Sequence, residues 1–192
     1  MKKVLITGGA GFIGYHLAKK IASNGASVHI VDNFARGVSD SELESLLAED
    51  NVSFDNIDLL NDELDQRLGD DYDYIFHLAA IIGVKIVLGR PYDVLNDNVK
   101  LTAKMLELAA NQKNLKRFLF ASTSEVYAGT LRYHDIEMPT PESTPLTVNS
   151  LTEPRTTYML SKIYGEAMCN NSSVPTTNFR PHNVYGPRMG MA

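Results

Sequence analysis

The sequence has a single cysteine, Cys169, and it lacks both a long apolar run and a block of basic residues. One cysteine cannot form an intramolecular disulfide and argues against a cysteine-built metal site. The net charge is −5 and the lysines and arginines are scattered, so the electrostatic footprint of nucleic-acid binding is missing. The apolar start ends at Thr7, too early for a signal-peptide core or a membrane span. We therefore expect a cytoplasmic protein with no nucleic-acid or membrane partner.

Four of the five histidines, His16, His77, His134 and His182, show no metal-ligand spacing, and no metal site is predicted. His77 lies in an apolar run, which favours a packed core histidine. The 192 residues are 44% hydrophobic and 21% charged, which suits one domain, or one domain and the start of another.

Short apolar runs alternate with amphipathic stretches of helix length, the pattern of βαβ units around a parallel sheet. The predicted strands are Val4–Thr7, Ser27–Val31, Val52–Ile57, Tyr74–Leu78, Phe118–Ser122 and Thr176–Arg180. The predicted helices are Phe12–Asn24, Ser41–Glu49, Asp62–Leu68, Pro91–Gln112 and Thr156–Asn170. This order predicts an α/β fold of the Rossmann type, a doubly wound parallel sheet in a three-layer αβα arrangement. Gly129–Arg155 shows neither period and is rich in proline, serine and threonine, which predicts a long functional or disordered loop.

A glycine-rich turn follows the first predicted strand. Gly9, Gly11 and Gly14 satisfy G-x-G-x-x-G, and Gly8, Gly11 and Gly14 satisfy G-x-x-G-x-x-G. A pyrophosphate binds to exposed backbone N–H groups at the positive end of a helix. Glycines allow this close approach, because larger side chains would keep the pyrophosphate away from the backbone. The turn could also be only a tight structural turn, but its place between a strand and a helix favours dinucleotide binding.

Asp32 ends the second predicted strand, 24 residues after Gly8. An acidic residue near this spacing binds the ribose hydroxyls of NAD and repels the 2′-phosphate of NADP. The nearby Arg36 leaves NADP open as an alternative. The pattern nevertheless favours NAD.

Tyr158 and Lys162 lie one turn apart on one face of the last predicted helix. A phenol that titrates near ~10 must lose roughly 3 units to act as a base at neutral pH, which is about 4 kcal/mol. A cation ~4 Å away at an effective dielectric constant of ~20 supplies about that much. The pair could instead be two exposed helix residues. The hydroxyl of Thr123 follows the fifth predicted strand, where doubly wound sheets bind ligands.

Taken together, these motifs resemble the extended short-chain dehydrogenase/reductase family, and more narrowly its NAD-dependent nucleotide-sugar epimerases and dehydratases. The resemblance covers essentially the whole chain. Its motifs are Gly8–Gly14, His77–Ala80, Ala121–Tyr127, Tyr158 with Lys162, and Arg180–Arg188.

The resemblance implies a role for each matching residue. Thr123 would bind the sugar hydroxyl that is oxidised, Tyr158 would be the base, and Lys162 would tune Tyr158 and hold the nicotinamide ribose. Glu125 matches an acidic residue that promotes elimination in dehydratases, although it could equally be a structural carboxylate. The implied NAD-binding set is Gly8, Gly11, Phe12, Ile13, Gly14, Asp32, Asn33, Asp58, Leu59, Leu78, Ala79, Ala80, Asn98, Tyr158 and Lys162.

The sequence departs from the family pattern in three places and at its end. Leu101 replaces a usual glycine, Tyr15 replaces a frequent serine, and Ala128 separates Tyr127 from the expected glycine. Members of the family continue into a C-terminal substrate lobe, which is largely absent here. We therefore expect an NAD-binding domain over residues 1–181 and the start of a truncated lobe over residues 182–192.

The expected reaction is transient oxidation at C4 of a nucleotide sugar, with a UDP-sugar favoured as substrate. Epimerisation, dehydration or decarboxylation could follow, since Ser122–Tyr127 is similar to both sugar 4,6-dehydratases and UDP-glucuronate decarboxylases. Two rivals are a non-catalytic NAD-binding domain and an inert truncated product. The 192-residue chain alone is expected to bind cofactor but to turn over poorly.

The resemblance also implies a homodimer in which the helices at 91–112 and 156–170 pair across a two-fold axis. The apolar positions expected in that interface are Val94, Leu101, Met105, Leu108, Met159 and Ile163. These residues could instead face only their own sheet.

Overall fold

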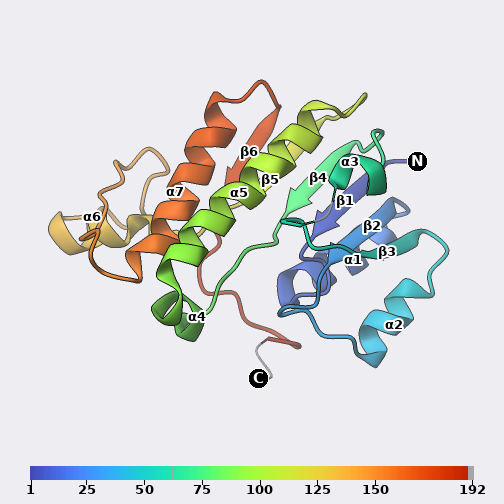
Figure 1. Ribbon diagram of the computed structural model, residues 1–192, viewed down its shortest axis with the longest axis horizontal. Helices are drawn as coiled ribbons and strands as arrows, with labels where there is room; N and C mark the ends of the chain where they lie inside the picture. The colour runs from blue at the N-terminus through green and yellow to red at the C-terminus, as the bar shows by residue number, and fades with distance from the viewer. Residues whose placement is uncertain (62, 190–192) are drawn as a thin grey trace.

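The computed structural model describes residues 1–61 and 63–189. Six parallel strands form one sheet in the order β3-β2-β1-β4-β5-β6 (Figure 1). The strands are β1 Lys3–Thr7, β2 Ser27–Asp32, β3 Val52–Asn56, β4 Tyr74–His77, β5 Arg117–Ala121 and β6 Thr176–Phe179. The helices are α1 Phe12–Ser23, α2 Ser41–Leu47, α3 Leu64–Arg67, α4 Val84–Gly89, α5 Pro91–Ala110, α6 Ala128–Tyr133 and α7 Thr156–Asn171, with a 3-10 turn, η1, at Ser124–Tyr127.

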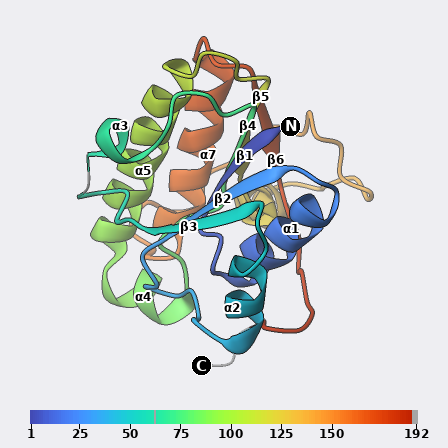
Figure 2. The ribbon, with the colours of Figure 1, turned by 90° about the vertical axis from the view of Figure 1, so that its right-hand side faces the viewer.

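Helices cover both faces of the sheet, as the alternating sequence pattern predicts. Figure 2 shows α5 and α7 on one face and α1 and α2 on the other. Each face buries its own apolar cluster, one around Leu5, Ile75 and Met105 and one around Ile6, Ile30 and Ala18. The doubly wound three-layer fold is therefore confirmed.

The five predicted helices are present, with boundary differences of a few residues. The third is shorter than predicted, since α3 covers Leu64–Arg67, and the predicted start at Asp62 lies outside the described residues. The prediction missed α4 and η1, and it missed α6, which occupies the start of the expected loop.

Packing against a distant part of the chain accounts for α6. A Cβ atom on Gly129 would lie 1.7 Å from the carbonyl oxygen of Thr147, so only glycine fits there. The Thr130 hydroxyl donates to the carbonyl of Pro145 at 2.8 Å and accepts from the N–H of Thr147 at 3.0 Å. These contacts span about 15 residues, and no local periodicity reports them.

The apolar residues expected in a dimer interface are mostly core residues of a single chain. Val94, Leu101, Met105, Leu108 and Met159 are 0–6% exposed, and only Ile163 is partly accessible. The sequence expectation was wrong for those five, because their spacing also fits the face that each helix turns toward its own sheet and neighbouring helix.

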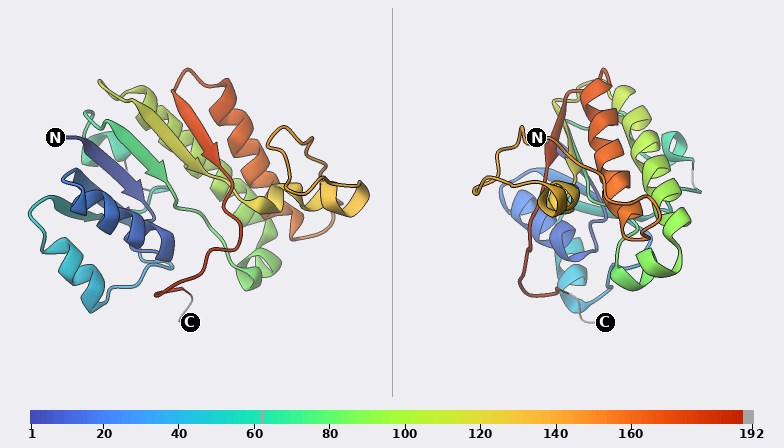
Figure 3. Two further views of the ribbon diagram at one scale, coloured as in Figure 1. Left: turned by 180° about the vertical axis from the view of Figure 1, so that it is seen from behind. Right: turned by 90° about the vertical axis from the view of Figure 1, so that its left-hand side faces the viewer.

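After β6 the chain leaves the sheet and runs past the carboxyl ends of the strands toward α1 and α2 (Figure 3). There His16 Nε2 lies 3.0 Å from the carbonyl oxygen of Pro187, and Arg188 Nε donates to Asp40 Oδ2 at 3.0 Å. The segment after β6 therefore contacts α1 and the start of α2 at the carboxyl edge of the sheet.

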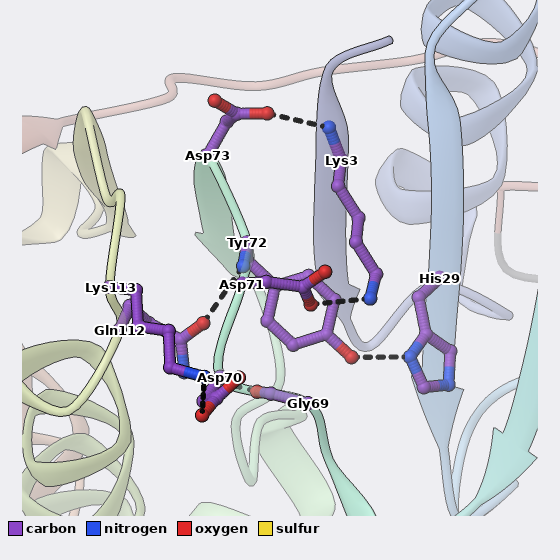
Figure 4. A network of polar contacts seen from close by, with 9 residues as sticks. All are labelled: Lys3, His29, Gly69, Asp70, Asp71, Tyr72, Asp73, Gln112 and Lys113. Carbon is purple, nitrogen blue, oxygen red and sulfur yellow. Dashed lines mark hydrogen bonds and ion pairs between the residues drawn. The ribbon is translucent and has the colours of Figure 1, made fainter.

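The opposite edge of the sheet, at the amino ends of the strands, is joined by polar contacts (Figure 4). The Lys3 N–H donates to Asp73 Oδ2 at 2.8 Å, and the Tyr72 hydroxyl lies 2.6 Å from His29 Nδ1. The Tyr72 N–H donates to Gln112 Oε1 at 2.9 Å. These bonds connect β1, β2, the start of β4 and the turn after α5, on the far side of the sheet from the carboxyl ends.

His77 is a packed core histidine, as its place in an apolar run indicated. It is 2% exposed, its Nδ1 lies 2.8 Å from the Thr7 hydroxyl, and its ring lies 6.1 Å from the rings of Phe118 and Phe120. Burial lowers the pKa of His77 to about 3, and the charge of Lys162 acts in the same direction.

We expect His77 to make the fold sensitive to acid. In the unfolded chain the imidazole takes up a proton below about pH 6.5, whereas in the folded chain it stays neutral down to about pH 3. As the pH is lowered from about 6.5 to about 3, the free energy of unfolding should therefore fall, and His77 should contribute up to about 1.4 kcal/mol per pH unit to this loss. Urea unfolding across that range measures the slope.

His77→Gln should flatten this pH dependence, while His134→Gln, at an exposed histidine, should leave the slope in place. Equal slopes in wild type and His77→Gln would show that the buried imidazole does not cause the acid sensitivity.

Candidate functional site

The glycine turn between β1 and α1 brings backbone against backbone. Gly8 has φ +72°, and a Cβ atom there would lie 2.8 Å from the backbone nitrogen of Ala79. A Cβ atom on Gly14 would lie 2.2 Å from the carbonyl oxygen of Gly8. Side chains at either position would therefore push the first turn of α1 or the end of β4 away from the turn.

The first turn of α1 has the donors that an anion requires. Gly11 is the N-cap, and among the described residues no side chain caps this helix. Phe12 and Ile13 open the helix, so their N–H groups have no carbonyl one turn earlier within it. Together with the helix dipole, they can bind a phosphate without any cationic side chain.

Asp32 lies at the carboxyl end of β2 and holds the turn. Its Oδ2 accepts from the N–H of Ala10 at 3.1 Å, and its Oδ1 accepts from the N–H of Phe34 at 2.8 Å. Burial raises the pKa of the Asp32 carboxyl, while these backbone N–H groups act in the opposite direction. A carboxylate fixed beside the glycine turn can accept ribose hydroxyls and would repel a further phosphate.

Asn33 and Arg36 continue from this strand end. Asn33 Oδ1 accepts from the N–H of Ala35 at 3.0 Å. Arg36 Nη1 donates to the carbonyl of Ile82 at 3.1 Å, which places its guanidinium at the segment after β4. In this structure the Arg36 guanidinium therefore binds the backbone after β4 and not the Asp32 carboxylate.

The residues expected near the adenine follow β3. Asp58 Oδ1 accepts from the N–H of Leu60 and its Oδ2 accepts from Asn61 Nδ2, both at 3.0 Å. The Leu59 side chain is 5% exposed and belongs to the core. Any contact of Leu59 with a cofactor would therefore have to come from its backbone.

The segment Leu78–Ala80 leaves β4 beside the turn, and Ala79 N–H donates to the Thr7 hydroxyl at 3.4 Å. Asn98, from α5, holds the next residue. Its Oδ1 accepts from the N–H of Ile81 at 2.7 Å, and its Nδ2 donates to the carbonyl of Ile81 at 3.0 Å. Asn98 is 4% exposed, so it shapes the segment after β4 and has little surface to offer a ligand.

Tyr158, in the first turn of α7, lies next to Thr123 at the end of β5. Burial raises the pKa of the Tyr158 phenol above its usual range, and the Glu125 carboxylate adds to this. A hydrogen bond with the Thr123 side chain and the charge of Arg36 act in the opposite direction. The Thr123 side chain and the Tyr158 phenol therefore lie close together.

Lys162 lies one turn further along α7, and its ammonium group is enclosed. Its Nζ donates to the carbonyl of Ala121 at 2.7 Å and lies 5.9 Å from the centre of the Tyr158 ring. Burial lowers the pKa of Lys162 to about 8. The expected lowering of the Tyr158 pKa by a nearby cation is not met here, because burial is the largest influence on the pKa of both groups.

Glu125 lies in η1, two residues after Thr123, and is exposed. Thr123 Oγ1 accepts from the N–H of Glu125 at 3.2 Å and so begins this turn. The carboxylate is close enough to Tyr158 to influence its ionisation, which places it at the same end of β5.

A partly buried ion pair, which the sequence pattern did not indicate, lies behind these residues. Glu166 Oε2 and Arg180 Nη2 are 2.6 Å apart, and Glu166 Oε1 accepts from Arg180 Nε at 2.8 Å and from the Ser122 hydroxyl at 2.5 Å. The available signal was the position of Glu166, four residues after Lys162 on the same helix.

The structure also accounts for Tyr15, which departs from the family pattern. Tyr15 is 2% exposed, and the guanidinium of Arg188 lies 3.9 Å from the centre of its ring. Arg188 also donates to Asp40, the N-cap of α2. The tyrosine is therefore a packing surface for the segment after β6.

The site fits a dinucleotide. The turn from Gly8 to Gly14 is a cradle that Cβ atoms would fill, the first turn of α1 supplies N–H donors, and Asp32 lies beside it. Tyr158 and Thr123 stand at the carboxyl end of β5, two strands from β1 in the same sheet.

Comparisons with known proteins agree with this geometry. A sequence model described as the NAD dependent epimerase/dehydratase family matches residues 4–192. UDP-N-acetyl-alpha-D-glucosaminuronate decarboxylase of Bacillus cytotoxicus is 36% identical over 97% of this chain and 56% of its own length. UDP-glucuronic acid decarboxylase 1 of Xenopus tropicalis is 35% identical over 99% of this chain and 43% of its own.

Solved structures are similar as well. UDP-glucose 4-epimerase of Thermotoga maritima, with UDP-glucose, has a TM-score of 0.78 and 30% identity, over 98% of this chain and 58% of that one. UDP-glucuronic acid 4-epimerase of Bacillus cereus, in complex with NAD, has a TM-score of 0.75 and 29% identity, over 97% of this chain and 58% of that one. The chain spans about half the length of these relatives. Among the described helices, none is long and apolar enough to cross a membrane.

Proposed function

The chain belongs to the NAD-dependent epimerase/dehydratase family, and on this premise we propose that it binds NAD(H) and oxidises a hydroxyl of a nucleotide sugar. The observation that carries the proposal is that the Tyr158 phenol lies close enough to the Thr123 side chain, just after β5, for Thr123 to influence its ionisation. Lys162 and Glu125 lie beside that pair, and the glycine turn opens at the same edge of the sheet.

The groups proposed to hold NAD(H) follow from the site. The N–H groups of Phe12 and Ile13, after the N-cap Gly11, would bind the pyrophosphate, and Asp32 with Asn33 would bind the adenosine ribose. Asp58 and Leu59 would flank the adenine, Leu78–Ala80 would lie along the cofactor, and Lys162 would hold the second ribose. When bound, NAD+ supplies the hydride acceptor and a positive charge.

The residues of the chain would then transfer one proton, that of the sugar hydroxyl. Thr123 would orient the sugar hydroxyl, and Tyr158 Oη would take its proton as the hydride leaves the carbon. Because burial raises the pKa of Tyr158 in this structure, its action as a base depends on positive charge nearby. Arg36 already contributes in that direction, and Lys162 can add to it where it is protonated.

Cofactor choice is the first test. We expect NAD+ to bind at least tenfold more tightly than NADP+ in calorimetry. A phosphate ~6 Å from the Asp32 carboxylate, at an effective dielectric constant of ~20, would be repelled by about 3 kcal/mol. Asp32→Asn should shrink this ratio, and Asp50→Asn, at an exposed position before β3, should not change it. Equal binding of the two cofactors to the unmodified chain would refute the role of Asp32.

Tyr158 is the second test. Tyr158→Phe should keep the affinity for NAD+ within about twofold and slow hydride transfer from UDP-glucose or UDP-glucuronate at least ~100-fold, since only the proton acceptor is lost. Reduced nicotinamide is followed by its absorbance in single-turnover assays. Tyr164→Phe removes an exposed hydroxyl from the same helix and should have no effect. Undiminished hydride transfer in Tyr158→Phe would overturn the mechanism.

Glu125 separates the reactions that could follow oxidation. In a dehydratase that eliminates water through Glu125, Glu125→Gln should accumulate the keto sugar and reduced cofactor, whereas an epimerase should lose little. Decarboxylation is the second candidate function. It is supported by the similarity of the stretch Ser122–Tyr127 to that of UDP-glucuronate decarboxylases, and by the two decarboxylases among the relatives.

We also propose that the chain forms a homodimer through α5 and α7. Leu95, Val99, Leu160 and Ile163 are apolar residues on these helices that stay partly accessible. Light scattering at micromolar concentration should give twice the mass of the chain. Val99→Glu should halve it, while Lys100→Glu, at the exposed neighbour, should not. A wild-type chain of monomer mass would exclude the dimer.

A further inference from the structure

Three residues of α7 point toward the ends of two neighbouring strands. Tyr158, Lys162 and Glu166 are spaced by four residues and are 4–6% exposed. The first two belong to the site described above. Among the described residues, the Glu166 carboxylate bonds to Ser122 and Arg180, neither of which is assigned to the cofactor or sugar site.

The Glu166 carboxylate connects α7 with the ends of β5 and β6. Its Oε1 accepts from the Ser122 hydroxyl at 2.5 Å and from Arg180 Nε at 2.8 Å, and its Oε2 accepts from Arg180 Nη2 at 2.6 Å. Ser122 directly precedes Thr123. The pair is enclosed, since the side chains of Glu166 and Arg180 are 7% and 20% exposed.

Arg180 extends the connection to the other side of Thr123. Its Nη1 donates to the hydroxyl of Tyr127, in η1, and to the carbonyl of Glu142 at 3.2 Å. The guanidinium also lies 4.9 Å from the centre of the Tyr127 ring. The residues on both sides of Thr123 are thereby held by one ion pair.

Stability alone is a weak reason for such a pair. Burying the Glu166 charge and partly burying that of Arg180 costs desolvation, and well-packed apolar residues of similar volume are often as stabilising. A bidentate arginine–carboxylate pair instead fixes distance and orientation. Here it fixes the position of Ser122 and Tyr127, and so of Thr123, relative to the helix that carries Tyr158.

We propose that Glu166 and Arg180 are positioning residues, which set the contact between the Thr123 and Tyr158 hydroxyls by holding the end of β5 against α7. The proposal rests on the proposed roles of Thr123 and Tyr158. It can be tested without turnover, because the contact itself can be observed.

The experiment uses the full chain with tyrosine labelled by ¹³C at Cζ, whose resonance responds to hydrogen bonding of the hydroxyl. Tyr158→Phe assigns the Tyr158 signal, and Thr123→Val shows its position when the contact is lost. Glu166→Gln should move the signal in the same direction as Thr123→Val. If Glu166 acts through Thr123, the double variant should shift no further than Thr123→Val alone.

Leu108→Ala is the control for lost stability. Leu108 is 3% exposed near the end of α5, so its truncation should lower the urea midpoint and leave the Tyr158 signal in place. Should Glu166→Gln fail to fold, Arg180→Lys keeps the positive charge but loses the fork geometry, and it should shift the same signal. A Tyr158 resonance at the wild-type position in the folded variants, with only a lowered urea midpoint, would overturn the proposal.

The two proposals fail separately. If Tyr158→Phe keeps full hydride transfer, the proposed function is wrong, yet the effect of Glu166 on the Thr123–Tyr158 contact can still be read from the spectra. If the spectra show no effect of Glu166 while Tyr158→Phe is inactive, only the positioning role is lost.

Discussion

The site depends on the way α7 is fixed to the end of β5. Lys162 donates to the backbone carbonyl of Ala121, and Glu166 accepts from the side chain of Ser122, so two consecutive residues of the strand end are bonded to one helix. The bond to Ser122 is buried and the bond to Ala121 is partly buried, so an unsatisfied partner would be costly. Thr123 comes next in the chain, and its place beside Tyr158 follows from these two bonds.

Much of this arrangement could be predicted because it depends on neighbours in the sequence. The strands and the longer helices follow from local apolar patterns, and a parallel sheet brings their carboxyl ends to one edge. Asp32 and the glycine turn lie on adjacent strand ends, and Tyr158 and Lys162 are one helical turn apart. These placements need only the fold and the spacing.

Other features could not be predicted because they depend on contacts between distant residues. Nothing near Gly129 in the sequence shows that the carbonyl of Thr147 lies against it, and nothing near Arg36 shows that it reaches Ile82. The pKa of Tyr158 is a similar case, since it reflects how deeply the phenol is buried. Val94 and Met105 were assigned to the wrong surface because one apolar helical stripe fits either a core or an interface.

The spacing of Tyr158, Lys162 and Glu166 also limits how α7 can change. Four residues turn a helix by about 400°, so each successive side chain is rotated by about 40° from the one before. This gradual rotation lets one helix reach Thr123, Ala121 and then the ion partner at the end of β6. Substitutions on the outer surface of α7 leave that alignment intact. An insertion or deletion of one residue between 158 and 166 would turn part of the set by about 100° and separate the reacting hydroxyls from the groups that hold them.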